Sequence, residues 1–200
     1  GPQYFDEINL VKPGFNSGWI SVMGPVALEY PVSAIGDDSP TQTIPEPFEN
    51  FEYSEPEFTW YTSVAPTEIV FTDSDNFLRY SDWLFVGDFN NGVIYKFKLN
   101  ADREGFVFSN PELSDLVLDP NDEIDENIFA SDFQGVIDVK FHDDAMYVLS
   151  FGDGKIYKIL SLYISPPLDQ YQKGVPHNEI VCREAFMPIM SKSGSVHCVK

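Results

Sequence analysis

The chain has 200 residues, enough to bury a substantial core as one domain or as two small ones. Its formal net charge is −20, from 12 basic and 32 acidic residues, so phosphate backbones and anionic membrane surfaces repel it and we expect no nucleic-acid partner. The hydrophobic fraction of 43% excludes a disordered chain, and no apolar run approaches the ~20 residues of a membrane-spanning helix.

The composition favours strands. The chain contains 17 phenylalanines and 10 tyrosines, which both prefer pleated, half-buried surfaces. Its 15 prolines and 13 glycines divide it into short segments, and no amphipathic pattern of about ten residues or more predicts a long helix. The sequence therefore predicts an all-β protein.

The N-terminal part predicts one short strand and a long surface excursion. Residues 6–11 are expected to form a short strand, and the Pro-Gly turn that follows is expected to bring Trp19 onto an apolar surface. Residues 31–58 are rich in Pro, Asp and Glu, and four aromatic residues are expected to anchor this segment: Phe48, Phe51, Tyr53 and Phe58. Strand character returns at residues 59–71.

A repeated hairpin dominates the middle of the chain. Residues 84–97 (LFVGDFNNGVIYKF) align without a gap on residues 146–159 (MYVLSFGDGKIYKI), at one constant offset. Each copy is an apolar run, a turn with Asn-Gly or Asp-Gly, and a second alternating run, which is the strongest short-range signal for a β-hairpin. A hairpin repeated at long period is typical of propeller blades.

The repeat extends towards the N-terminus of each copy. Residues 69–71 match residues 139–141, and residues 106–108 supply an outer strand, so each unit has three or four strands. This pattern predicts a β-propeller with about three blades in residues 1–165. A sandwich of two meanders is the competing interpretation.

Residues 166–200 lose the repeat and are expected to form a tail that packs across the blades. The two cysteines of the chain, Cys182 and Cys198, both lie in this tail. A bond between them would close a loop of about fifteen residues and contribute roughly 3 kcal/mol. We favour that disulfide over two free thiols, and it would place the protein in an oxidising compartment, extracellular or periplasmic.

Candidate metal ligands lie at the start of the chain. Gly1 and Pro2 offer backbone carbonyls, and Asp6 and Glu7 follow as adjacent carboxylates; oxygen ligands of these kinds suit Ca²⁺. The acidic run at residues 119–126 lacks the glycine and the final glutamate of a calcium loop, so it is interpreted as a solvated loop. The three histidines match no metal-binding spacing.

The first nineteen residues, GPQYFDEINLVKPGFNSGW, resemble the soluble quinoprotein glucose/sorbosone dehydrogenase family, whose motif reads GP, three variable residues, DEIN, a turn and NxGW. The resemblance covers roughly residues 1–160. It implies a six-bladed propeller about twice as long as this chain. It also implies that the carbonyls of Gly1 and Pro2 hold a Ca²⁺ ion that orients the cofactor PQQ, with Asp6 and Glu7 binding a cation nearby or fixing the loop.

Three positions depart from the family pattern. Where the family places a lysine beside PQQ, this chain has Asn90, or Asn91 with a slip of one residue. Where the family places two arginines, it has Gly135 and Ile137. PQQ carries three carboxylates, and the loss of three cations leaves that charge unpaired.

Two functions from different classes follow. The resemblance implies an aldose sugar dehydrogenase that uses PQQ and Ca²⁺, whereas the departures favour a non-catalytic extracellular calcium-binding propeller used for binding or assembly. A third class, a propeller lactonase, would need acidic metal ligands that the sequence does not identify. Because a partial propeller exposes apolar faces and strand edges, we expect association with a missing half, another fragment or a second copy, besides a sugar or other small molecule.

Overall fold

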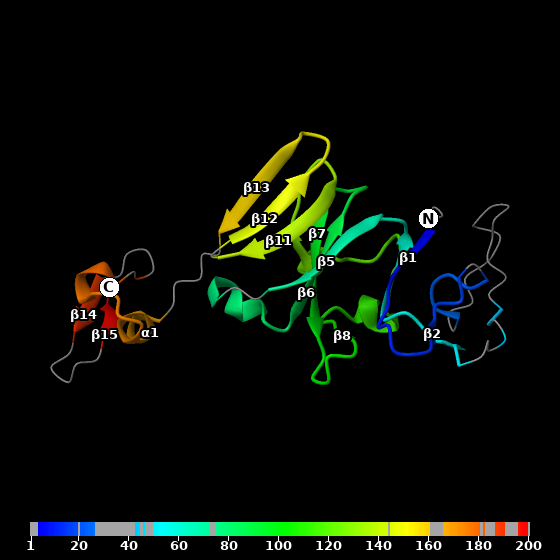
Figure 1. The fold of residues 1–200 in the computed structure, drawn as a ribbon, viewed down its shortest axis with the longest axis horizontal. Coiled ribbons are helices and arrows are strands. Elements are labelled where there is room, and N and C mark those ends of the chain that lie inside the picture. The colour runs from blue at the N-terminus through cyan, green and yellow to red at the C-terminus, as the bar shows by residue number, and fades with distance from the viewer. Residues whose placement is uncertain are drawn as a thin grey trace.

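The computed structural model describes residues 4–19, 21–26, 43–44, 46, 50–72, 75–143, 145–160, 166–180, 182, 187–190 and 196–199. Strands dominate this part of the chain, and its one α-helix is α1 (Pro167–Gln172). The all-β prediction is confirmed. Three sheets hold most of the strands and are called blades 1, 2 and 3 in chain order (Figure 1).

Blade 1 has the strand order β1-β4-β9. Strand β1 (Tyr4–Ile8) runs antiparallel to β4 (Phe58–Thr62), and β9 (Val117–Leu118) joins β4 in parallel from far along the chain. Beside this blade, β2 (Phe15–Asn16) and β3 (Glu52–Tyr53) form a short parallel pair. The expected N-terminal strand is therefore present, although it starts and ends earlier than residues 6–11.

Blade 2 is the middle and most complete sheet. Its order is β10-β7-β6-β5, and β8 also pairs with β7. The bounds are β5 (Pro66–Phe71), β6 (Trp83–Asp88), β7 (Val93–Leu99), β8 (Phe106–Val107) and β10 (Ile128–Ala130). The predicted outer strand is thus β8.

Blade 3 is an antiparallel meander of β11 (Val136–His142), β12 (Ala145–Ser150) and β13 (Lys155–Leu160). Within the described residues, β13 pairs with β12 alone, so its other edge is the end of the sheet. Short 3-10 helices connect the strands: η3 (Asp75–Tyr80), η4 (Pro111–Asp115) and η5 (Asp125–Asn127) in and around blade 2, and η6 (His177–Glu179) after α1.

The two predicted hairpins adopt the same register. Leu84 pairs with Phe97 in blade 2, and Met146 pairs with Ile159 at the matching place in blade 3. Both turns contain a glycine with positive φ, 64° at Gly92 and 62° at Gly154, which only glycine adopts readily. The repeat prediction is confirmed.

Two apolar cores alternate with the blades. The first lies between blades 1 and 2 and contains Phe58, Trp60, Val86 and Phe97, all fully buried. The second lies between blades 2 and 3 and includes Phe85, Ile94, Val136, Met146 and Val148. Successive residues of β6 and β7 point to opposite cores, as expected for a sheet covered on both faces. Blade-on-blade packing thus accounts for the alternating apolar pattern of the repeat.

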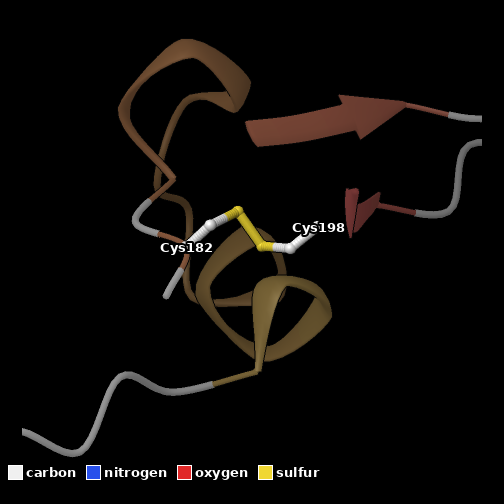
Figure 2. The surroundings of a disulfide bond; sticks show 2 residues. All are labelled: Cys182 and Cys198. Atoms are coloured by element: carbon white, nitrogen blue, oxygen red, sulfur yellow. A yellow bond between two sulfur atoms is a disulfide. The ribbon is translucent and has the colours of Figure 1, made fainter. Parts of the chain in front are cut away.

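The C-terminal segment forms a small unit of its own at one end of the molecule (Figure 1). It consists of α1, η6 and the antiparallel hairpin of β14 (Met187–Met190) and β15 (Val196–Val199). A disulfide joins Cys182 to Cys198, with 5.8 Å between the Cα atoms, and it lies between α1 and the hairpin (Figure 2). Because residues 161–165 lie outside the described residues, the packing of this segment on the blades stays a prediction.

Of the aromatic anchors expected from the sequence, Phe58 is fully buried in the core and is confirmed, whereas Trp19 and Phe51 are wrong. Trp19 is 61% exposed and Phe51 is 45% exposed, so neither is buried in the core. The turn before Trp19 is instead held by polar bonds, in which the Asn16 side chain accepts from the Gly18 amide at 2.9 Å. Most of the excursion at residues 31–58, including Phe48, lies outside the described residues.

Candidate functional site

Asp6 fixes the loop that connects blade 1 to blade 2. Its Oδ2 atom accepts three hydrogen bonds, from the Ser63 hydroxyl at 2.6 Å and from the amides of Val64 and Ala65, each at 2.8 Å. Ala65 has a positive φ of 51°, which is costly for a residue with a side chain. The carboxylate therefore stabilises a strained loop, which is a complete structural role for Asp6.

Glu7, the neighbouring acid, points to a different loop. Its two carboxylate oxygens accept from the Gly24 amide at 2.6 Å and from the Asn9 side chain at 3.2 Å. Burial raises the pKa of Glu7, and these two hydrogen bonds oppose the shift. Asp6 and Glu7 thus hold two separate loops, as expected for adjacent residues of one strand whose side chains point to opposite faces.

Asn90 stands in the turn between β6 and β7 and is tied to the loop that Asp6 organises. Its side-chain amide donates to the Ser63 carbonyl at 2.9 Å, and its backbone amide donates to the Val64 carbonyl at 3.1 Å. The Phe89 amide adds a third link, to the Ala65 carbonyl at 3.2 Å. The turn of blade 2 and the loop after blade 1 therefore form one hydrogen-bonded layer.

Asp88 is the polar centre of this turn, and the sequence reasoning missed it. It is fully buried and accepts from the Asn91 amide and the Asn91 side chain, each at 2.8 Å, and from the Tyr95 hydroxyl at 3.1 Å. Desolvation raises the pKa of Asp88, although these hydrogen bonds oppose the shift. An aspartate three residues before an asparagine in a hairpin turn is the local signal that would have identified it.

An aromatic pair lies beside the same turn. Phe89 and Phe151 occupy equivalent positions of the two hairpins, with ring centroids 5.9 Å apart, and both rings are partly exposed. Gly135 has a φ of 83°, and a Cβ atom there would lie 3.0 Å from the Phe89 ring. Its carbonyl accepts from the Phe151 amide at 2.8 Å. The two rings therefore sit on a rigid backbone, and Gly135 permits their approach.

Among the described residues, the predicted calcium ligands do not converge on one point. Gly1 and Pro2 lie outside them, so their carbonyls stay a prediction. Asp6 and Glu7 are committed to separate loops. Nowhere in the described part of the chain do three or more His, Cys, Asp or Glu residues gather as a metal site.

Comparison with known proteins identifies the family. The family model described as Glucose / Sorbosone dehydrogenase matches residues 1–157. The chain belongs to this family. The resemblance seen in the first nineteen residues is confirmed, and the three blades are part of the family's β-propeller, which removes the sandwich alternative. A search of curated proteins finds no match.

Two solved structures are similar to the chain. One is a crystal structure of glucose dehydrogenase, with 17% identity and a TM-score of 0.49. The other is the soluble aldose sugar dehydrogenase (Asd) from Escherichia coli in the apo-form, with 19% identity and a TM-score of 0.48. Each match covers 80% of this chain and 39% of the other chain, so this chain spans about two fifths of their length.

The residues at the implied cofactor positions do not fit PQQ. Asn90 uses its side chain on the Ser63 carbonyl, and the space beside Gly135 is filled by the Phe89 ring, so an arginine there would have to displace that ring. Ile137 is an uncharged residue on strand β11. All three implied cation positions are thus uncharged; Gly135 is packed against a ring, and Asn90 is an exposed residue bonded to the neighbouring loop.

Proposed function

We propose that this chain supplies blades of a non-catalytic, extracytoplasmic propeller of the glucose/sorbosone dehydrogenase family, which binds an uncharged small molecule such as a sugar and does not use PQQ. The observation that carries this proposal is the bond between the Asn90 side chain and the Ser63 carbonyl. It gives the residue at the implied lysine position a structural task, as a hydrogen-bond donor to the backbone of the neighbouring loop.

Electrostatics support the proposal. A cofactor with three carboxylates needs cations close to it, because each charge that is desolvated without a partner costs several kcal/mol. The chain carries a net charge of −20, and Asn90, Gly135 and Ile137 supply no positive charge. The long-range field and the local contacts therefore both disfavour such an anion.

The aromatic pair favours an uncharged ring as ligand. Phe89 is 38% exposed and Phe151 is 64% exposed, and their backbones are fixed by bonds to Ala65 and Gly135. Rigid, exposed aromatic rings offer apolar area at a small entropic cost. The C–H face of a sugar ring can pack on such a surface while its hydroxyls bind nearby polar groups.

An aldose dehydrogenase that uses PQQ and Ca²⁺ is the second candidate. The family match over residues 1–157 favours it, and the carbonyls of Gly1 and Pro2 would then be calcium ligands. Affinity for the quinone is the property by which an experiment can distinguish the two candidates.

The test is a titration of the protein with PQQ in excess Ca²⁺, followed by quinone absorbance and by dye reduction with aldoses. We expect no saturable absorbance shift and no dye reduction. The Asn90→Lys variant should bind PQQ more tightly than the matched control Ser109→Lys, which adds the same charge on an exposed residue elsewhere. A saturable shift with dye reduction by the unaltered protein would overturn the proposal and establish the dehydrogenase.

Further observations support an extracytoplasmic compartment and completion of the propeller by further blades. The Cys182–Cys198 disulfide supports an extracellular or periplasmic location, because cytosolic thiols are normally kept reduced. Within the described residues, no helix combines the length and apolarity that a bilayer crossing requires.

Blade 3 exposes Ile156 and Leu160 on one face. In blade 2 the equivalent face is covered by the neighbouring blade, so we propose that further blades of the propeller cover this face of blade 3.

A further inference from the structure

A two-part cleft lies between blades 1 and 2, at the opposite end of β6 from Asn90. One part is polar and has a volume of about 360 Å³; the other is apolar and has a volume of about 220 Å³. The two parts share three lining residues, Leu10, Glu57 and Glu104, so they adjoin along one ridge. Among the described positions discussed for the quinone or for calcium, none lines either part.

The polar part has the composition of a site for an organic cation. Its lining includes the carboxylates of Glu52, Glu57 and Glu104 but a single ammonium group, that of Lys12, which leaves an excess of negative charge. The half-buried rings of Phe15 and Tyr53 complete the wall. Carboxylates together with aromatic faces are the groups that bind ammonium ions.

The protein itself places an alkylammonium group in this part. The Nζ atom of Lys12 lies 2.8 Å from the Glu104 carboxylate, although both side chains are more than half exposed. A pair of this kind is weak, because water and salt compete with it. A ligand with its own ammonium group can therefore displace Lys12 at small cost, and the lysine shows which chemistry the Glu104 carboxylate accepts.

The apolar part offers a place for a hydrocarbon chain. Ile69 is 50% exposed and Phe71 is 48% exposed, and both line it together with the half-buried Phe106. Large apolar side chains that line a concave surface and stay exposed are typical of a ligand site. The Arg103 guanidinium lies at the rim, 5.8 Å from the Phe71 ring and 3.0 Å from Asp82, in an exposed pair like that of Lys12.

We propose that this cleft binds a cationic amphiphile, an organic amine with one short hydrocarbon chain. The ammonium group replaces that of Lys12 at Glu104, with Glu57 in the same lining, and the chain lies along Ile69 and Phe71. The overall charge of −20 raises the local concentration of any such cation. The site is independent of the proposed function, because it lies at the other end of the blades.

Titration calorimetry with three probes that share an eight-carbon chain tests the charge preference. Octylammonium should bind saturably, with one molecule per chain, and should bind at least about tenfold more tightly than octanol or octyl sulfate, a difference of about 1.4 kcal/mol. Equal affinity for the uncharged or the anionic probe would overturn the proposal, as would the lack of saturable binding by octylammonium.

Variants test the placement of the head group and the chain. Lys12→Ala should tighten octylammonium binding about fivefold, whereas Lys173→Ala, which removes an exposed lysine from the C-terminal segment, should leave it unchanged. Glu57→Gln keeps an acceptor for the Leu10 amide and should weaken binding about fivefold. Phe71→Ala should remove most of the advantage of octylammonium over butylammonium. Weaker binding by Lys12→Ala, or an unchanged chain-length preference in Phe71→Ala, would contradict the assignment.

Discussion

The hairpins of blades 2 and 3 share their sequence pattern and register but differ in their surroundings. Ile94 of β7 is fully buried, whereas its counterpart Ile156 of β13 is 69% exposed. The strands have matching bounds, Trp83–Asp88 and Ala145–Ser150, and the cross-strand pairs coincide. The difference comes from the neighbours, since blade 2 lies between two blades and blade 3 has one within the described residues.

The comparison separates two kinds of information in the repeat. The alternating pattern and the turn glycine determine which residues pair, and they therefore produce the same hairpin in blade 2 and in blade 3. Burial depends on whether another sheet covers the face, which a repeat unit does not encode. Substitutions at equivalent positions therefore should have unequal effects on stability.

The largest difference is expected at the turn glycines. At Gly92, a Cβ atom would lie 1.8 Å from the backbone oxygen of Phe133, whereas at Gly154 no heavy atom of the described residues lies within 4 Å. Both residues have a positive φ, which costs an alanine about 1 kcal/mol. Gly92→Ala should add a clash with backbone and lower the free energy of unfolding by about 4 kcal/mol, against about 1 kcal/mol for Gly154→Ala.

Urea unfolding followed by circular dichroism measures both losses. Gly154→Ala serves as the matched control, because it has the same backbone conformation without the clash. Equal losses in the two variants would show that the close approach of the turn to Phe133 is absent in solution.

A smaller difference is expected at the paired isoleucines. Ile94→Ala leaves a cavity in the core between blades 2 and 3 and should cost about 3 kcal/mol of unfolding free energy. Ile156→Ala should cost less than about 0.5 kcal/mol, because its side chain is mostly exposed in the chain by itself.

Self-association provides a second measurement on Ile156, the exposed member of the isoleucine pair. If a second copy of this chain covers blade 3, size-exclusion chromatography should show a species larger than the 22.7 kDa of the single chain. Ile156→Asp should abolish that species, since a buried unpaired carboxylate is costly, and should leave the fold of the chain intact. A single species of monomer size in the unaltered protein would contradict completion of the propeller by a second copy of this chain.

The sequence predicted the parts of the fold that depend on local pattern. The two hairpins, their glycine turns and the outer strand β8 follow from residues close together in the chain. The parallel pairing of β9 with β4 was not predicted, because it joins Val117 to Thr59 across a long stretch of chain and β9 has only two residues. The α1–β14–β15 unit was missed because its short elements carry no clear period.

The candidate site was predicted less well. The sequence identified Asp6, Glu7 and Asn90 as positions to inspect, but their roles depend on partners such as Ser63 and Gly24 that lie in other loops. The resemblance suggested that the two acids bind a cation or fix the loop; in the structure both accept hydrogen bonds from loop residues, and cation binding stays a prediction. A carboxylate that binds a loop and one that binds a metal look identical in a sequence.

The smallest difference concerns acid stability. It arises because the aspartate that binds the tyrosine hydroxyl stands at different positions in the two hairpins. In blade 2, Tyr95 donates to Asp88 at the end of the first strand; in blade 3, the equivalent Tyr157 donates to Asp153 three residues later in the turn. Burial raises the pKa of Asp88. Hydrogen bonds lower the pKa of Asp153 to about 2; the one from Tyr157 contributes most, and the one from Ser150 contributes less.

These opposite shifts predict opposite pH dependences. Asp153 contributes stability that is present above its unfolded pKa of about 3.9 and is lost as the pH falls towards about 2. Folded Asp88 binds a proton more readily than unfolded Asp88, so its contribution grows as the pH falls through its raised pKa. Relative to the unaltered protein, Asp153→Asn should therefore lose most stability at neutral pH and least at low pH, and Asp88→Asn the reverse. Unfolding free energies of both variants across this range measure the two slopes. Slopes of the same sign would mean that the two turns hold their aspartates in similar surroundings, and the inequality between the hairpins would then be confined to their apolar faces.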